Sequence, residues 1–343
     1  MKTRIILFAV ICGLFLIPLI PLQGQSGGDY EITINKLNAR IKKLEEEKQT
    51  LETKLKKCQK KGSCDELQAE NNRLKEEVKK LNKDLAEYLS SNNSENKTVL
   101  DIKDPTFKAY LLRFCDMDND GEITTWDAEH TYVIDCSIVN KGRSGSQPIY
   151  GLDGIEAFKN LKKLVCSGNE IRLLDLSHNT LLETLEANGC SLKVLNISEN
   201  TELKRLSCKN NALRELDINN NPKLTFLDVS NNELNIVLLN NNPKLTKFYC
   251  ANNGLVSIMA SNNVELTIID CSNNELNSLD LSNTAIDSVM CQNNRLTFLD
   301  LRNERTISYL DCTKNKNLKE VLISNNYNVK SDNKNKNTQY IYK

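Results

Sequence analysis

From residue 161 onward the sequence repeats itself about every 21 residues, and this period limits the fold more than any other feature. The first half of each unit reads Leu-x-x-Leu-x-Cys-x-x-Asn-x-Leu, and the second half reads Leu-Asp-Leu-Ser-x-Asn. A unit this short cannot bury its apolar side chains alone, so each turn must stack on its neighbours. The period therefore predicts a solenoid of eight turns over residues 161–326.

Six cysteines recur at one place in the repeat, the position that follows the Leu-x pair. They are Cys166, Cys208, Cys250, Cys271, Cys291 and Cys312. In a strand alternate residues face one side, so Leu and Cys should point inward together. Ala187 and Val229 take the same place in two turns, and neither can bind a metal ion or form a disulfide. We therefore predict a structural ladder of buried thiols rather than a row of zinc ligands or disulfides.

Composition excludes several classes of function. The chain has 45 basic and 45 acidic residues and so a net charge of zero, which gives no general attraction to nucleic acid or anionic lipid. It has only two histidines, and it lacks the Gly-x-Ser-x-Gly and His-Glu-x-x-His motifs of hydrolases. We predict that the protein is not an enzyme.

The first 24 residues have the pattern of a secretory signal peptide. A basic start precedes an apolar run over 5–17, and Pro18 and Pro21 follow it before Gly24. We expect cleavage near Gly24 and a secreted or cell-surface protein. The alternative is an uncleaved apolar helix that anchors the protein in a membrane.

Residues 31–89 carry leucine and isoleucine at heptad spacing among many charged residues, which predicts an α-helical coiled-coil stalk. The heptads change phase near Gly62, and Ser63 to Glu66 has the form of a capping box that begins a second helix. Residues 90–99 follow as a polar linker.

Two arrangements of the stalk remain open. The helices form an antiparallel hairpin, with Cys58 and Cys64 available to bridge the turn, or they form a parallel homodimer. The second helix favours the dimer, because a buried asparagine at one core position can pair with its twin in a second chain. Its two sets of core positions are Leu67, Leu74 and Leu81, and Asn71, Val78 and Leu85.

Residues 100–160 are predicted to form a small cap that contains an EF-hand-like calcium loop. Acidic residues occupy positions 1, 3, 5 and 12 of the loop, and Gly121 takes position 6, where the sharp turn requires glycine. The ligand oxygens are expected from Asp116, Asp118, Asp120, Glu122 (through its carbonyl), Thr124 and Asp127. Asp127 departs from the usual, longer Glu at position 12. A single loop predicts one structural calcium ion rather than a sensor built on paired loops.

Together these motifs resemble the bacterial leucine-rich-repeat proteins with 21-residue units and a cysteine ladder, the internalin-J-like group. Cys271 to Leu281 follows the pattern most closely. The order of signal, calcium loop, cap and repeats is also similar to secreted proteins of Bacteroidetes, and 149–161 resembles the N-terminal cap of such domains, with Cys136 as a first ladder position. The resemblance implies a mostly β leucine-rich-repeat solenoid of stacked parallel strands, with 327–343 as a C-terminal tail or cap.

The resemblance also implies a protein that binds other proteins or glycans, and the outer face of the stacked strands is where a partner is expected. From the fourth turn onward, apolar residues occur at the outward positions: Phe226, Tyr249, Ile268, Met290 and Tyr309. Such a strip is typical of a contact site. The leading prediction is a secreted or cell-surface protein-binding scaffold on an oligomeric stalk. The alternative is a structural spacer of the cell envelope.

Overall fold

The computed structural model describes residues 40, 43–44, 65–91, 97–137, 147–302, 307–324 and 331–342. They belong to two compact units. The first unit holds the described residues up to Lys97 together with Asp116–Gly121, and the second holds Thr98–Cys115 and the described residues from Glu122 onward. The predicted signal peptide lies outside the described residues. Within the described ranges, no helix has the length and apolar character needed to cross a membrane.

The described chain contains few helices and many short strands. The helices are α3 (Asp65–Ser91), α4 (Pro105–Phe114), α5 (Thr125–Glu129) and the 3-10 helix η1 (Ile155–Ala157). The main sheet contains, in spatial order, β1 (Val133–Asp135), β2 (Lys163–Val165), β4 (Thr184–Glu186), β6 (Arg205–Ser207), β7 (Phe226–Asp228), β8 (Lys247–Tyr249), β10 (Ile268–Asp270), β12 (Ser288–Met290), β14 (Tyr309–Asp311) and β16 (Asp332–Asn333). Smaller sheets pair β3 (Leu173–Asp175) with β5 (Val194–Asn196), β9 (Ser257–Met259) with β11 (Ser278–Asp280), and β13 (Phe298–Leu301) with β15 (Glu320–Ile323) and β17 (Gln339–Tyr342).

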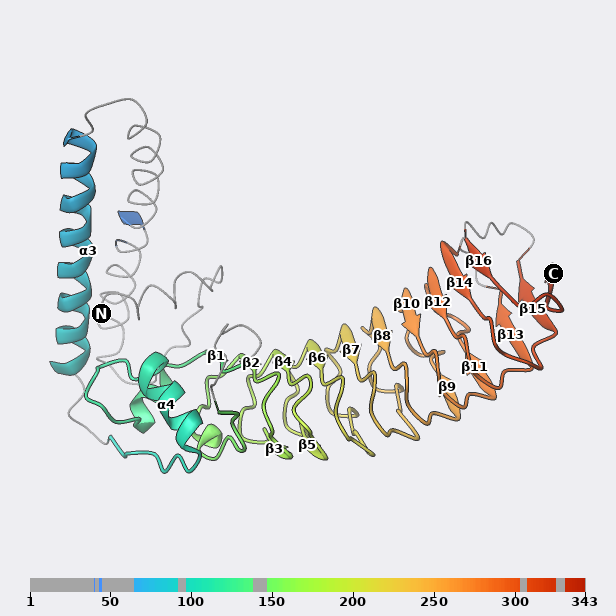
Figure 1. Cartoon of the computed structure of the whole chain (residues 1–343), viewed down its shortest axis with the longest axis horizontal. Coiled ribbons are helices and arrows are strands. Elements are labelled where there is room, and N and C mark those ends of the chain that lie inside the picture. The colour runs from blue at the N-terminus through green and yellow to red at the C-terminus, as the bar shows by residue number, and fades with distance from the viewer. Residues whose placement is uncertain are drawn as a thin grey trace. The chain divides into compact units, whose positions relative to one another are not determined.

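The main sheet is built from one short strand per repeat, and its strands follow one another from β1 to β14 (Figure 1). Neighbouring strands are parallel and in register, so that Leu185 lies beside Leu164 and Leu206 beside Leu185. These central leucines are fully buried and belong to one continuous core that also includes residues of the cap, such as Phe107 and Phe158. The predicted solenoid of about 21-residue repeats is confirmed.

Asparagine columns explain why the repeat needs this residue at fixed spacing. The Asn211 amide group donates to the carbonyls of Ala187 and Cys208, both at 2.8 Å, and its Oδ1 accepts from the Leu192 amide at 3.0 Å. One side chain thus satisfies backbone groups of two turns, which would otherwise be buried without partners. A second column, in the second half of the repeat, contains Asn179, Asn200, Asn221, Asn242 and Asn263, all fully buried.

The doubled asparagines of the repeat have two separate roles. Asn210 and Asn231 each directly precede an asparagine of the first column and have positive φ angles of 57°. Asparagine tolerates this left-handed conformation better than most residues, so it suits the tight turn. The asparagine that follows turns its amide inward, as Asn211 and Asn232 do. The Asn-Asn pairs therefore mark the point where the strand ends and the chain reverses inward.

The end of the solenoid extends further than the repeat pattern predicts. Within the expected tail 327–343, β16 pairs with β14 and β17 pairs with β15. The Thr338 hydroxyl donates to the Leu318 carbonyl at 2.9 Å, which is the kind of bond that asparagine makes in earlier turns. This segment therefore continues the stacking without the leucine and cysteine pattern.

The first unit contains α3, which begins two residues after the predicted capping serine and ends at Ser91 rather than 89. Leu44 is buried against Leu74 and Val78, and the Arg40 guanidinium lies 2.9 Å from the Glu77 carboxylate. These contacts correspond to the hairpin arrangement of the two that the heptads allow. A parallel homodimer would need the same faces of Leu74 and Val78, which Leu44 of the same chain covers. The parallel homodimer of the stalk stays a prediction.

Candidate binding surface and cation loop

The outer face of the main sheet is defined by the three-residue length of its strands. In each main-sheet strand from β2 to β14 the central residue points into the core, and the first and third residues point to the opposite face, where Val165, Ser207 and Asp228 are nevertheless covered by their neighbours. Because the strands pair in register, the first residues stack into one column and the third residues into another. We call these the first-position column and the third-position column.

The five residues of the predicted apolar strip lie on five consecutive strands of this face. Phe226, Ile268 and Tyr309 occupy the first-position column on β7, β10 and β14, and Tyr249 and Met290 occupy the third-position column on β8 and β12. All five side chains are half-buried. The rings of Phe226 and Tyr249 are in contact, with centroids 5.6 Å apart. The strip therefore places one apolar side chain on each of the five strands and crosses from column to column at each strand.

A row of acidic residues shares this face. It occupies the third-position column on every second strand and consists of Asp135, Glu186, Asp228, Asp270 and Asp311. Strands lie about 4.8 Å apart, so alternate carboxylates are about 10 Å apart. Sequence analysis missed this row, although the acids could have been found by reading the outward positions over two repeats instead of one.

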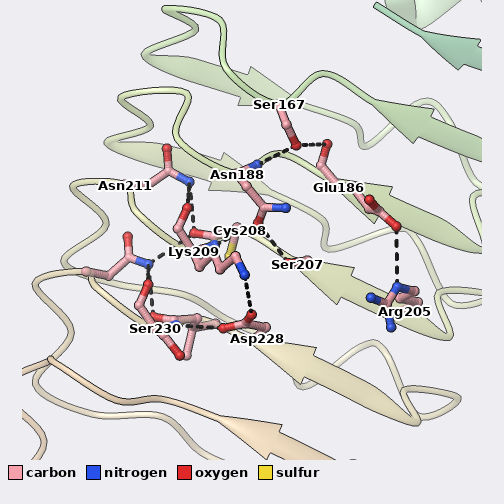
Figure 2. Close-up of polar contacts among 12 residues, drawn as sticks. Ser167, Glu186, Asn188, Arg205, Ser207, Cys208, Lys209, Asn211, Asp228 and Ser230 are labelled. Carbon is pink, nitrogen blue, oxygen red and sulfur yellow. Dashed lines mark hydrogen bonds and ion pairs between the residues drawn. The ribbon is translucent and has the colours of Figure 1, made fainter. Parts of the chain in front are cut away.

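In the N-terminal half of the face these charges are paired. Glu186 lies 3.4 Å from the Arg205 guanidinium, and Asp228 lies 3.7 Å from the Lys209 ammonium (Figure 2). The same guanidinium is stacked over the Phe226 ring, 3.7 Å from its centroid. Surface ion pairs of this kind add little stability, although Asp228 itself is buried, and they neutralise this half of the surface.

In the C-terminal half the carboxylates have a different environment. Asp270 Oδ1 accepts from the amide and hydroxyl of Ser272, at 3.1 and 2.7 Å, and Asp311 Oδ1 accepts from the same groups of Thr313. No ion pair of Asp270 or Asp311 occurs within the described ranges. Burial raises the pKa of the Tyr249 phenol, and the negative charges of Asp228 and Asp270 raise it further. This half of the face is therefore negatively charged.

The six predicted ladder cysteines are all fully buried. They form no disulfides with one another, and Cys136 occupies the corresponding buried position next to β1. Burial raises the pKa of the Cys250, Cys271 and Cys291 thiols well above the usual value, and it raises the pKa of Cys312 to about 12. Neutral, inaccessible thiols of this kind pack as small apolar groups and are poor nucleophiles.

Three predicted calcium ligands gather in the first unit. One carboxylate oxygen from each of Asp116, Asp118 and Asp120 lies within 4.8 Å of the other two. Gly121, at φ 89°, directs its amide toward Asp116 Oδ2 at 3.1 Å, which holds the loop in its turn. The Lys97 ammonium contacts Asp118 and lies 3.8 Å from Asp120. Three clustered carboxylates are a donor set that suits a hard cation such as calcium.

The remaining predicted ligands belong to the second unit. Asp127 is fully buried, and its Oδ2 accepts from the amide and hydroxyl of Thr124, at 2.9 and 2.7 Å. Together they form the capping box of α5. The Glu122 side chain is exposed. The structure therefore gives Thr124 and Asp127 a helix-capping role, and their role as ligands stays a prediction.

A short β-bridge supports the chain after the loop. Val99 and Thr124 form an antiparallel bridge, in which the Leu100 amide donates to the Ile123 carbonyl at 2.7 Å and the Thr125 amide donates to the Thr98 carbonyl at 2.9 Å. Residues 98–100 thus supply backbone hydrogen-bond partners for residues 123–125, which follow the clustered aspartates of the loop. Sequence analysis did not find this bridge, because a partner of two or three residues has no periodic signal.

No protein-family profile matches the sequence, and no curated protein matches it. Among solved structures, the functional domain of InlJ from Listeria monocytogenes, which includes a cysteine ladder, is similar with a TM-score of 0.56 and 24% identity. The match covers 71% of this chain and 61% of that domain, so this chain spans less than two thirds of its length. The APL1 leucine-rich repeat domain is 24% identical over 50% of each chain, with a TM-score of 0.35. The likeness to InlJ shows the fold, a leucine-rich-repeat solenoid with a ladder of cysteines.

Proposed function

We propose that this protein is a non-enzymatic scaffold that binds another protein, or a glycan, through the outer face of its main sheet. The observation that carries the proposal is the apolar strip, which has one outward side chain on each of β7, β8, β10, β12 and β14. Its side chains are half-buried and held by in-register neighbours, so little conformational freedom would be lost on binding. Aromatic residues in such a setting commonly dominate binding energy.

A structural spacer of the cell envelope is the alternative function. A spacer needs a stable core and a polar surface, and it gains nothing from outward apolar side chains. A strip of aromatic, Ile and Met side chains costs solubility unless a partner covers it. The strip therefore favours binding over a purely structural role.

The binding proposal can be tested by selection with the full chain. A library of displayed random twelve-residue peptides is selected on the wild-type protein and on the variant Tyr249→Ser/Met290→Ser. The control variant is Leu238→Ser/Met259→Ser, because both of these side chains are exposed and lie outside the main sheet. We expect peptides that bind the wild type and the control but not the strip variant. Peptides that bind all three proteins equally would contradict the proposal, and a glycan array read with the same proteins tests the glycan alternative.

We also propose that the aspartate cluster binds one calcium ion with a structural role. The clustered oxygens of Asp116, Asp118 and Asp120 support it, together with the glycine at position 6. We expect calcium to raise the melting temperature of the wild type, and Asp116→Ala/Asp120→Ala to abolish this rise, whereas the exposed neighbour variant Asp101→Ala keeps it. A calcium response that persists in the double variant would place the ion elsewhere.

We further propose that the protein is secreted or lies at the cell surface. The signal-like pattern of residues 1–24 supports this localisation. The intact mass of protein recovered from the culture medium should correspond to a chain that lacks these residues. A full-length mass confined to the membrane fraction would favour the anchored alternative.

A further inference from the structure

We infer that the partner of the outer face is an extended, polyproline II-like peptide segment with a basic residue at every third position. The inference rests on the proposed function and names the chemistry of the partner. It is carried by the part of the main sheet from β7 to β14, where the apolar strip and the acidic row run side by side.

On these five strands every strand presents one apolar and one polar outward residue, and the two exchange columns at each step. In order, the pairs are Phe226 and Asp228, Lys247 and Tyr249, Ile268 and Asp270, Ser288 and Met290, and Tyr309 and Asp311. The five polar positions hold three aspartates, one lysine and one serine, so the surface is acidic. A partner that covers it must therefore supply positive charge between apolar contacts.

The carboxylates that would receive this charge are already held in place. Asp270 Oδ1 and Asp311 Oδ1 each accept two hydrogen bonds from the residue two positions later in the chain. Their orientation is thus fixed before binding, which lowers the entropic cost of forming an ion pair. Asp228, by contrast, already lies 3.7 Å from the Lys209 ammonium. We therefore expect the cations of the partner to bind at Asp270 and Asp311.

The spacing of the two carboxylates selects the conformation of the partner. They stand two strands apart, which is about 10 Å. A polyproline II helix advances about 9.3 Å in its three-residue turn and brings every third side chain to the same side. A β-strand repeats a face every two residues, at about 6.6 Å, which does not fit. An α-helix returns to the same side every three or four residues, about 5.4 Å, and its side chains reach a separation of about 10.5 Å only when they are seven residues apart.

Four labelled twelve-residue peptides distinguish these cases. The first repeats Lys-Pro-Val, the second has the same composition with its lysines clustered at one end, the third places two lysines seven residues apart in an alanine-rich helix, and the fourth replaces Lys by Glu. Binding to the full chain is measured by fluorescence anisotropy at several salt concentrations. We expect the first peptide to bind at least about ten-fold more tightly than each of the others, with an affinity that falls as salt rises.

The protein variants test whether the aspartates receive the charge. Asp270→Asn/Asp311→Asn keeps the oxygen that accepts the local hydrogen bonds and removes only the charge. It should weaken the Lys-Pro-Val peptide at least about ten-fold. The control Asp175→Asn/Asp280→Asn removes two charges from β3 and β11, outside the main sheet, where each Oδ1 also accepts from the amide two residues later, and it should leave binding unchanged.

The results separate this inference from the proposed function. Equal binding of the spaced and clustered peptides, or no effect of Asp270→Asn/Asp311→Asn, overturns the inference. If selected peptides still depend on Tyr249 and Met290 but show no three-residue period of basic residues, the scaffold function stands and this partner class is wrong. If no peptide distinguishes the wild type from the Tyr249→Ser/Met290→Ser variant, the proposed function fails as well.

Discussion

At the scale of single residues, two positions of the asparagine columns hold a different residue, and these substitutes show what the position requires. Cys190 stands in the first asparagine column, and its thiol donates to the Cys166 carbonyl at 3.2 Å. That is the bond that Asn211 makes to the turn before it, but a thiol is a weaker donor and supplies only one hydrogen. Thr284 replaces the last asparagine of the second column and donates to the carbonyl of Leu281 in its own turn. Each substitute has a single hydrogen to donate where asparagine has two, and the Cys190 thiol also lies 3.6 Å from the Asn188 carbonyl.

The same substitution should therefore have opposite effects at two cysteines. Cys190→Asn restores the amide of the column, and we expect it to raise the free energy of unfolding by about 1 kcal/mol, the usual net value of one added hydrogen bond. Cys250→Asn places an amide in the apolar ladder without prepared partners, and we expect a loss of about 2–4 kcal/mol. Urea unfolding of both variants under reducing conditions measures the two changes. A loss at position 190 as large as that at 250 would show that the column does not accept a second amide there.

At the scale of elements, the cysteine ladder behaves as one buried column whose members must stay protonated. Burial raises the pKa of Cys312 from 9.0 to about 12, and it raises the pKa of the ladder thiols Cys250 and Cys271 well above 9.0. The folded chain therefore keeps protons that the unfolded chain releases above about pH 9. Protons bound more tightly by the folded state stabilise it at low pH and cease to do so as pH rises through the folded pKa.

We therefore expect the free energy of unfolding to fall between pH 9 and 12, by up to about 1.4 kcal/mol per pH unit for each thiol. Urea unfolding at pH 8.0, 9.0 and 10.0 with a reductant measures the slope. Cys250→Ala is the matched control, because alanine occurs naturally at this place as Ala187, and the variant should show a smaller slope. An identical slope in wild type and variant would mean that the ladder thiols do not cause the pH dependence.

The α3 helix gives a second prediction at this scale. Leu44 covers Leu74 and Val78, whereas Lys43 beside it is exposed. Leu44→Asp should expose this cluster and place a carboxylate against it, which we expect to cost about 3 kcal/mol and to lower the helical circular dichroism signal of the chain. Lys43→Asp should change neither by a comparable amount. Sedimentation should find a monomer, and a dimer that persists in Leu44→Asp would support the parallel arrangement instead.

The heptad pattern shows where sequence analysis ends at the element scale. It predicted the position of α3 to within two residues, because apolar spacing determines which side of a helix is buried. It could not determine what covers that side, because a neighbouring segment and a second chain satisfy the same pattern. The contact between Leu44 and Val78 is a tertiary contact, and the local spacing of apolar residues does not predict it.

At the scale of the whole molecule, the solenoid should tolerate the loss of a complete turn. Residues 219–225 and 240–246 both read Asn-Asn-Asn-Pro-Lys-Leu-Thr, so deletion of 225–245 joins Leu224 to Thr246 without changing the local sequence at the junction. Each turn contacts only its neighbours, so we expect a folded protein with a cooperative and slightly lower melting transition. Deletion of 225–234 removes half a turn, breaks the register of the columns and should prevent folding of the C-terminal turns. Similar melting of the two deletion variants would contradict nearest-neighbour stacking.

The repeat explains how much of the second unit could be predicted. A 21-residue period assigned the strands, the inward leucines and the buried cysteines, because stacking makes local position and burial equivalent in each turn. It missed β16 and β17, whose turn lacks leucine and cysteine at the expected places. The apolar strip was visible at the outward positions, but the acidic row was not, because its period is two turns. The aspartates of the loop were recognised by spacing alone, whereas the capping role of Asp127 depends on the geometry of α5.

The alternation of the acidic row has a consequence for how such a chain can change its length. Loss of a single turn between Asp228 and Asp270 would bring two carboxylates onto adjacent strands, about 4.8 Å apart, where they repel each other. Gain of one turn there would place the two carboxylates three strands apart and break the alternation of apolar and acidic side chains between the columns. Duplication of two turns, about 42 residues, preserves both patterns. The stacking of the backbone thus allows any number of turns to be added or lost, whereas the surface pattern is preserved only when that number is even.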